Sequence, residues 1–249
     1  MKRKTFERYL GVLSISIAAM TFVAACSLIE FLVNPKSEIP VSSFEKVSSI
    51  TVIIDPGHGG EDGGAVGNDI GLIEKEVNLS IAKELSAIFD FVEIPVKLTR
   101  KDDVLLCSES EMSGRKLSDL RNRVSIAESF DNPVFISIHQ NKFPLEKYYG
   151  LQVYYSKNND DSLFLAETIQ NKAKCYVQKE NNRQVKAAGR NIFVLNNLDC
   201  PAVLVECGFL SNSREEALLN THEYRRKLAF LIFSSIMDYY TSICENTNI

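Results

Sequence analysis

The sequence predicts a single α/β domain, with a mostly parallel, twisted sheet and helices on both of its faces. The first observation is that short runs rich in β-branched residues alternate along the chain with segments whose apolar residues recur at helical spacing. The second is size: 249 residues with 45% hydrophobic composition suffice for one α/β domain of about 200 residues and a short appendage. This alternation is typical of parallel strands joined by crossover helices.

The predicted strands are four to seven residues long and dense in valine and isoleucine, as expected of strands buried on both faces. They cover residues 49–55, 96–99, 134–139, 151–155 and 202–207.

The predicted helices lie between and after these strands, where apolar residues recur every three or four positions. Four such series occur: Val77, Ile81, Leu85 and Ile88; Leu117, Leu120, Val124 and Ala127; Leu165, Ile169, Ala173 and Val177; and Tyr224, Leu228, Leu231 and Ile236.

The N-terminal residues 1–33 are predicted to be an export signal or membrane anchor, because a basic leader precedes an uncharged stretch, 9–25. The run Val23-Ala24-Ala25-Cys26 resembles the lipobox of bacterial lipoproteins, in which the cysteine is lipidated. An uncleaved anchor helix and a plain secretory signal are the alternatives. We therefore expect an exported domain, anchored on the outer face of the cytoplasmic membrane through this segment. Residues 34–48 are a predicted linker, 49–241 the catalytic domain and 242–249 a tail.

The composition argues against nucleic acid as a partner, and the cysteines indicate no particular site. The net charge of −4 and the lack of a dense basic run in the domain argue against nucleic acid. Without Cys26, five cysteines remain, with no C-x-x-C spacing. Free thiols are therefore expected.

Chemistry-bearing residues follow three of the predicted strands, where ligand sites of open α/β sheets lie. His58 stands in a glycine-rich turn after the first strand, His139 ends the third, and Glu206 interrupts a strand that should be buried. Two histidines and a carboxylate, either Glu74 or Glu206, would make the three-ligand open site of a catalytic zinc. Each residue alone also has a purely structural explanation.

Six strings of the sequence jointly resemble the zinc-dependent N-acetylmuramoyl-L-alanine amidases of the amidase_3 family, in the family's order. The small domain after an N-terminal membrane segment looks most like the sporulation and germination branch, whose members act on spore cortex peptidoglycan. The strings are DPGHGG from Asp55, GLIEKEVNL from Gly71, LTR from Leu98, ISIH from Ile136, LQVYY from Leu151 and PAVLVECGFLSN from Pro201.

The resemblance implies one zinc ion per chain, held by His58, Glu74 and His139, with Glu206 as the catalytic carboxylate. The implied reaction is hydrolysis of the amide between the lactyl group of N-acetylmuramic acid and L-alanine in peptidoglycan. A zinc-binding histidine usually needs a second partner that orients it, and Asp55 is the candidate for His58.

Basic and polar residues beyond these ligands are candidates for substrate binding. They are Asn141, Arg183, Lys186 and Arg190. The family commonly places a small residue between the histidine and the asparagine, whereas this chain has Gln140 between His139 and Asn141. The sequence is compatible with an activating protein partner but contains no motif that identifies one.

Two other functions fit an exported domain with these residues. One is a different zinc hydrolase of the cell wall, a carboxypeptidase or a deacetylase. The other is a non-catalytic wall-binding lipoprotein, which would tolerate the loss of Glu206.

Overall fold

The computed structural model describes residues 50–107 and 114–246. The predicted export segment with Cys26, and the linker that follows it, lie outside these residues. Among the residues described, no helix is both long and apolar enough to cross a membrane.

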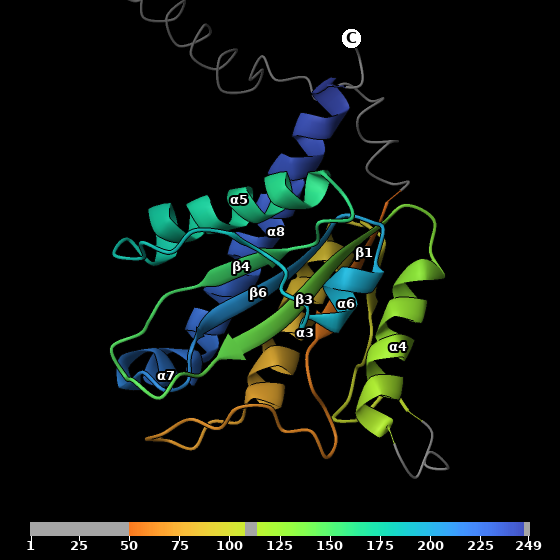
Figure 1. The fold of residues 1–249 in the computed structure, drawn as a ribbon. Helices are drawn as coiled ribbons and strands as arrows, with labels where there is room; N and C mark the ends of the chain where they lie inside the picture. The colour runs from red at the N-terminus through yellow and green to blue at the C-terminus, as the bar shows by residue number, and fades with distance from the viewer. Residues whose placement is uncertain (1–49, 108–113, 247–249) are drawn as a thin grey trace, which may run out of the picture. The chain divides into compact units, whose positions relative to one another are not determined.

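The described chain forms a six-stranded sheet in the order β2-β1-β3-β6-β4-β5 (Figure 1). Neighbouring strands pair in parallel except β4 and β6, which are antiparallel, so β4 and β5 run against the other four. The predicted mostly parallel α/β sheet is thus confirmed. The strands are β1 (Thr51–Pro56), β2 (Val96–Leu98), β3 (Pro133–Asn141), β4 (Gln152–Tyr155), β5 (Lys186–Ala187) and β6 (Ala202–Phe209).

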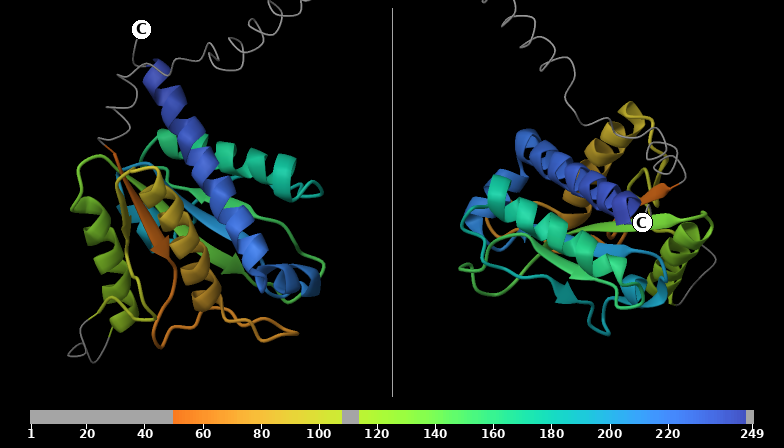
Figure 2. Two further views of the ribbon diagram at one scale, coloured as in Figure 1. Left: turned by 180° about the vertical axis from the view of Figure 1, so that it is seen from behind. Right: turned by 90° about the horizontal axis from the view of Figure 1, so that it is seen from above.

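Helices cover both faces of the sheet, also as predicted. They are α3 (Glu74–Phe91), α4 (Arg115–Glu128), α5 (Asp161–Lys172) with a π-helical turn η1 (Ala173–Val177), α6 (Phe193–Asn197), α7 (Ser213–Leu219) and α8 (His222–Asn246). The helices α3, α5 and α8 cover one face of the sheet and bury the larger apolar core against it. This face is towards the viewer in the left view of Figure 2. On the other face α4 and α6 bury a smaller core.

Alternation along the strands explains the two cores. In β6, Val203, Val205 and Cys207 face the larger core, whereas Ala202 and Leu204 face the smaller one. Because side chains of a strand point to alternate faces, Glu206 lies on the face covered by α4 and α6.

Some elements differ from the sequence prediction. The helix expected to run through Val177 changes at Ala173 into the π-helical turn η1. The short elements α6, α7 and β5 were not predicted, because five to seven residues or fewer show too little periodicity. The last helix, α8, continues to Asn246, beyond the expected end of the domain at 241.

Candidate metal centre and active site

Three predicted ligands meet where β1 and β3 end and α3 begins. His58 lies in the turn after β1, His139 near the end of β3, and Glu74 is the first residue of α3. Oε1 of Glu74 is 3.2 Å from Nε2 of His58 and 2.9 Å from Nδ1 of His139. One ligand atom from each residue lies within 4.8 Å of the other two. The structure thus brings together residues that are 16 to 81 positions apart in the chain.

These atoms fit a zinc ion by type and by spacing. Two imidazole nitrogens and one carboxylate oxygen are a usual zinc donor set, and ligand bonds of about 2.0–2.2 Å in a tetrahedron place neighbouring donors about 3.3 Å apart. Both histidine side chains keep about a fifth of their surface exposed (18% and 19%), so the cluster opens to solvent on one side.

Backbone groups hold Glu74 in place at the cluster. Its Oε2 accepts a hydrogen bond from the amide of Ala65 (2.7 Å), and its Oε1 accepts one from the amide of Gln140 (3.1 Å). Burial alone would raise the pKa of Glu74, but hydrogen bonds to His139 and His58 outweigh it and lower the pKa well below its usual value. The carboxylate is therefore ionised, as a metal ligand must be.

Glycines let the chain pass close to the three ligands. A side chain on Gly57 would place its Cβ 2.1 Å from Nε2 of His139, and one on Gly64 would place it 2.5 Å from Oε2 of Glu74. His58 itself adopts a left-handed backbone conformation, with φ of 62°. The glycine-rich run thus packs against the cluster in addition to turning the chain.

Two buried arginines bind the carbonyl groups of this turn. Arg123 of α4 donates to the carbonyl oxygens of Pro56 (3.0 Å) and His58 (2.8 Å). Arg100 donates to the carbonyl oxygens of Pro56 (2.9 Å) and Gly57 (3.0 Å). Because these bonds fix the backbone on both sides of His58, they stabilise its otherwise unfavourable left-handed conformation.

The expected role of Asp55 as the orienting partner of His58 is wrong. Its Oδ1 accepts hydrogen bonds from Thr99 (2.7 Å) and Arg123 (2.6 Å), and its Oδ2 accepts one from Ser137 (2.7 Å). The carboxylate that faces His58 belongs to Asp62, whose Oδ1 is 3.0 Å from Nδ1 of the ring. Asp55 meets Ser137 because these two residues pair on β1 and β3 and their side chains share one face of the sheet, whereas Asp62 lies in the same turn as His58.

Glu206 stands beside the cluster on β6, in register with His139 on β3. Its Oε2 is buried, and in the described part of the chain it has no hydrogen-bond partner. Burial raises the pKa of Glu206 to about 7, with His139 opposing the change. A bound cation would lower this pKa again, because positive charge favours the ionised carboxylate.

The other predicted site residues are less closely grouped. Asn141 ends β3 two residues after His139, and Arg183 contacts Gln152, the neighbour of Glu206 on β4. Lys186 and Arg190 are exposed, Lys186 on the edge strand β5 and Arg190 in the turn before α6.

Several residues of the site were missed by the sequence analysis, among them Arg123, Asp62 and Gln152. A signal for Arg123 was available: it shares a helical face with Leu120 and Ala127 and lies four positions after Asp119, to which it is bonded at 2.7 Å. The other two carry no pattern that would distinguish them from surface residues.

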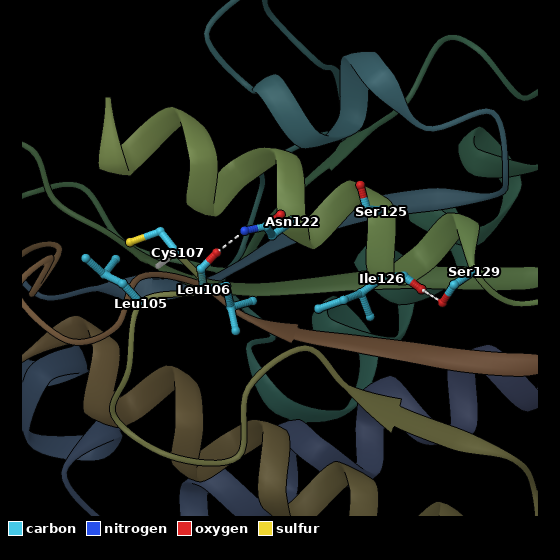
Figure 3. A pocket seen from close by; sticks show the side chains of 7 residues that line it. All are labelled: Leu105, Leu106, Cys107, Asn122, Ser125, Ile126 and Ser129. Carbon is cyan, nitrogen blue, oxygen red and sulfur yellow. Dashed lines mark hydrogen bonds between the residues drawn. The ribbon is translucent and has the colours of Figure 1, made fainter. Parts of the chain in front are cut away.

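A depression beside α4 is separate from this cluster (Figure 3). It lies between α4 and the segment 105–107, where the side chain of Asn122 donates to the carbonyl of Leu106. Of the described residues that line it, only Cys107 has an ionisable side chain, so it is a poorer candidate for hydrolytic chemistry.

Residues 52–238 match the Amidase_3 family, described as N-acetylmuramoyl-L-alanine amidase. The chain belongs to this family. It is 34% identical to the germination-specific N-acetylmuramoyl-L-alanine amidase of Bacillus subtilis over 197 residues, which cover 78% of this chain and 81% of the relative. It is also 31% identical to a probable amidase, AmiB, of Haemophilus influenzae, but spans only 52% of that protein.

Solved structures of the family share the fold. The CwlD amidase of Clostridioides difficile, solved in complex with the GerS lipoprotein, is 40% identical with a TM-score of 0.72, covering 76% of this chain and 97% of that one. The amidase AmiC2 of Nostoc punctiforme is 32% identical with a TM-score of 0.66, covering 77% and 97%. The expected amidase family and its activity are thereby confirmed, in preference to the other cell-wall functions.

Proposed function

We propose that this amidase is zinc-dependent, with His58, Glu74 and His139 as the ligands and Glu206 as the catalytic carboxylate. The observation that carries the proposal is the pairing of a three-donor cluster with an unpartnered buried carboxylate oxygen in register beside it. Buried polar groups almost always have partners, so an exception next to a metal-binding cluster indicates a group that meets its partner in the substrate complex.

The bond to be cleaved joins the lactyl carbonyl carbon of N-acetylmuramic acid to the nitrogen of L-alanine. Zinc, when bound, polarises the carbonyl and makes a water molecule more acidic. Glu206 takes a proton from the attacking water and delivers it to the nitrogen as the C–N bond breaks. The products are a lactyl carboxylic acid and a peptide with a free L-alanine amino group.

The chain's own residues keep the reacting groups in place. Backbone amides position Glu74, and the arginine-bound turn positions His58, so contacts within the protein hold these two side chains in the cluster. Preorganised ligands reduce the reorganisation needed during the reaction.

Product analysis tests the proposed reaction. The purified full-length chain is incubated with muropeptides before and after treatment with a zinc chelator, and the products are identified by mass spectrometry. We expect new L-alanine amino termini that disappear on chelation and return with zinc. Release of acetate would instead identify a deacetylase, release of a C-terminal amino acid a carboxypeptidase, and no product a binding protein.

We also propose that the chain works on spore peptidoglycan, outside the cytoplasm and attached to the membrane. Support comes from the B. subtilis relative, whose name gives it a germination-specific role, and from the basic and apolar N-terminal sequence. The C. difficile relative was solved with a lipoprotein, so an activating protein partner is proposed here as well.

Lipidation at Cys26 is tested separately. Cys26→Ser should abolish labelling of the chain by a fatty-acid probe. An intact Met1 terminus without label in the wild type would contradict lipidation.

A further inference from the structure

A bulge in the central sheet changes which side chains stand next to Glu206. His139 pairs with Glu206, but two residues later Asn141 pairs with Phe209, so β6 has one residue more than β3 in this stretch. Because Asn141 shares a face with His139, the extra residue brings Phe209 to the face that carries Glu206. Without the bulge, Phe209 would point to the opposite face.

Arg183 is held on this aromatic ring. Its guanidinium carbon is 4.4 Å from the ring centroid of Phe209, and its Nε donates to the carbonyl oxygen of Tyr149 (2.7 Å). Its Nη1 is 3.4 Å from Oε1 of Gln152, the residue that pairs with Glu206 on β4. The side chain is thus fixed beside the catalytic carboxylate by stacking and by hydrogen bonds.

The positive charge of Arg183 acts on the buried carboxylate of Glu215, but both oxygens of that carboxylate already accept hydrogen bonds from the backbone amides of Gly150 and Phe209. Among the described residues no carboxylate lies within ion-pair distance (4.0 Å) of the Arg183 guanidinium, and its Nη2 makes no hydrogen bond with another described group. The residue is only partly exposed. A fixed guanidinium with free donors at the edge of a substrate site is suited to bind a carboxylate, often through two hydrogen bonds.

The spacing selects a carboxylate in the stem peptide. Arg183 contacts Gln152, which pairs with Glu206 on the adjacent strand, so the guanidinium stands about one strand, or about 4.8 Å, to the side of the position of Glu206 in the sheet. Two residues of extended peptide span about 7 Å. In the stem peptide, L-alanine is followed by D-glutamate, which is linked through its side chain and keeps its α-carboxyl group free or amidated.

We propose that Arg183, stacked on Phe209, binds the free α-carboxylate of this D-glutamate and makes the enzyme prefer non-amidated stem peptides. The proposal rests on the proposed amidase reaction. It also sets the direction of the substrate: the peptide part runs from the metal centre over β6 towards β4, and the glycan leaves on the other side.

The test compares two synthetic muropeptides that differ only in a free or an amidated α-carboxyl group at D-glutamate. For the full-length wild type we expect kcat/KM to be about 10- to 100-fold higher with the free acid, the range for a hydrogen-bonded charge pair. Arg183→Gln should remove this preference by slowing the free-acid substrate far more than the amidated one, and Arg183→Lys should retain part of it. Zinc content should stay near the wild-type value in both variants.

Arg214→Gln is the matched control, because Arg214 is 81% exposed and is paired with Glu180. It removes the same charge and should keep the full preference. Equal cleavage of the two substrates by the wild type, or an unchanged preference in Arg183→Gln, would overturn the proposal. Failure of the proposed reaction itself would look different, since neither substrate would then be cleaved at L-alanine.

Discussion

Two carboxylates on the same face of the sheet have opposite surroundings. Asp55 on β1 is fully buried and receives hydrogen bonds on both oxygens, from Thr99, Arg123 and Ser137. Glu206, two strands away on β6, has a buried oxygen without a partner in the described part of the chain.

The pKa values follow this difference. Burial raises the pKa of both groups, but the charge of Arg123 and two hydroxyl hydrogen bonds outweigh it at Asp55, whose pKa is lowered. At Glu206 burial dominates, and the pKa rises to about 7. A carboxylate with all its partners inside the protein stabilises the fold, whereas one that lacks a partner is suited to exchange a proton with a substrate.

The largest effects are expected at the metal centre. His58→Ala, Glu74→Ala and His139→Ala each remove one donor of a three-donor site, so the variants should lose both zinc and activity. Metal analysis and muropeptide cleavage on the purified variants measure this.

The third histidine of the chain provides the control. His222 is exposed and contacts Glu84 at 2.7 Å, far along the chain from the cluster. His222→Ala should therefore keep zinc and full activity. Full zinc occupancy in all three ligand variants would show that zinc is bound elsewhere in the chain.

A smaller effect, on stability, is expected at the satisfied carboxylate. Arg123→Ala would leave Asp55 and Asp119 buried without their cation, which should lower the free energy of unfolding by about 3–5 kcal/mol. Urea denaturation measures the change. The exposed neighbour Arg121 is the control, since Arg121→Ala should change stability by about 0.5 kcal/mol or less. Similar stability of the two variants would mean that the buried network contributes nothing.

The smallest effect is the pH dependence contributed by Asp55. Its pKa in the folded state lies below that in the unfolded state, so its stabilisation is complete above about pH 4, the unfolded value, and is lost as pH falls towards the folded one. Unfolding measured between pH 6 and pH 2 should give the wild type a steeper acid decline than Asp55→Asn, by up to about 1.4 kcal/mol per pH unit. Parallel curves would contradict the lowered pKa.

The order of strands and helices and the three residues of the candidate metal cluster were predictable from the sequence. Dense β-branched runs defined five of the six strands, and the cluster residues stood at or just after strand ends or at the start of a helix, in motifs that resemble a known family. The two strand-end histidines are conspicuous because the chain has only one other.

Contacts between distant side chains were not predictable. The position of Asp55 suggested a partner for His58, but the ion pair with Arg123 forms across 68 positions of sequence. Likewise, the bulge in β6 that brings Phe209 beside Glu206 depends on the register of two strands 60 residues apart. Such pairings are set by tertiary packing, which leaves no periodic signal in either segment.

Glu206→Gln tests the contrast between the two carboxylates most directly, because glutamine keeps the shape of the side chain but cannot accept the proton. Zinc content, melting temperature and muropeptide cleavage are measured on one preparation, beside wild type and Asp55→Asn. We predict that Glu206→Gln keeps its zinc and its melting temperature while turnover falls by about 10²–10⁴-fold. Asp55→Asn should instead have a lower melting temperature while its turnover per folded molecule is retained. Near-normal turnover per folded molecule of Glu206→Gln would contradict the account.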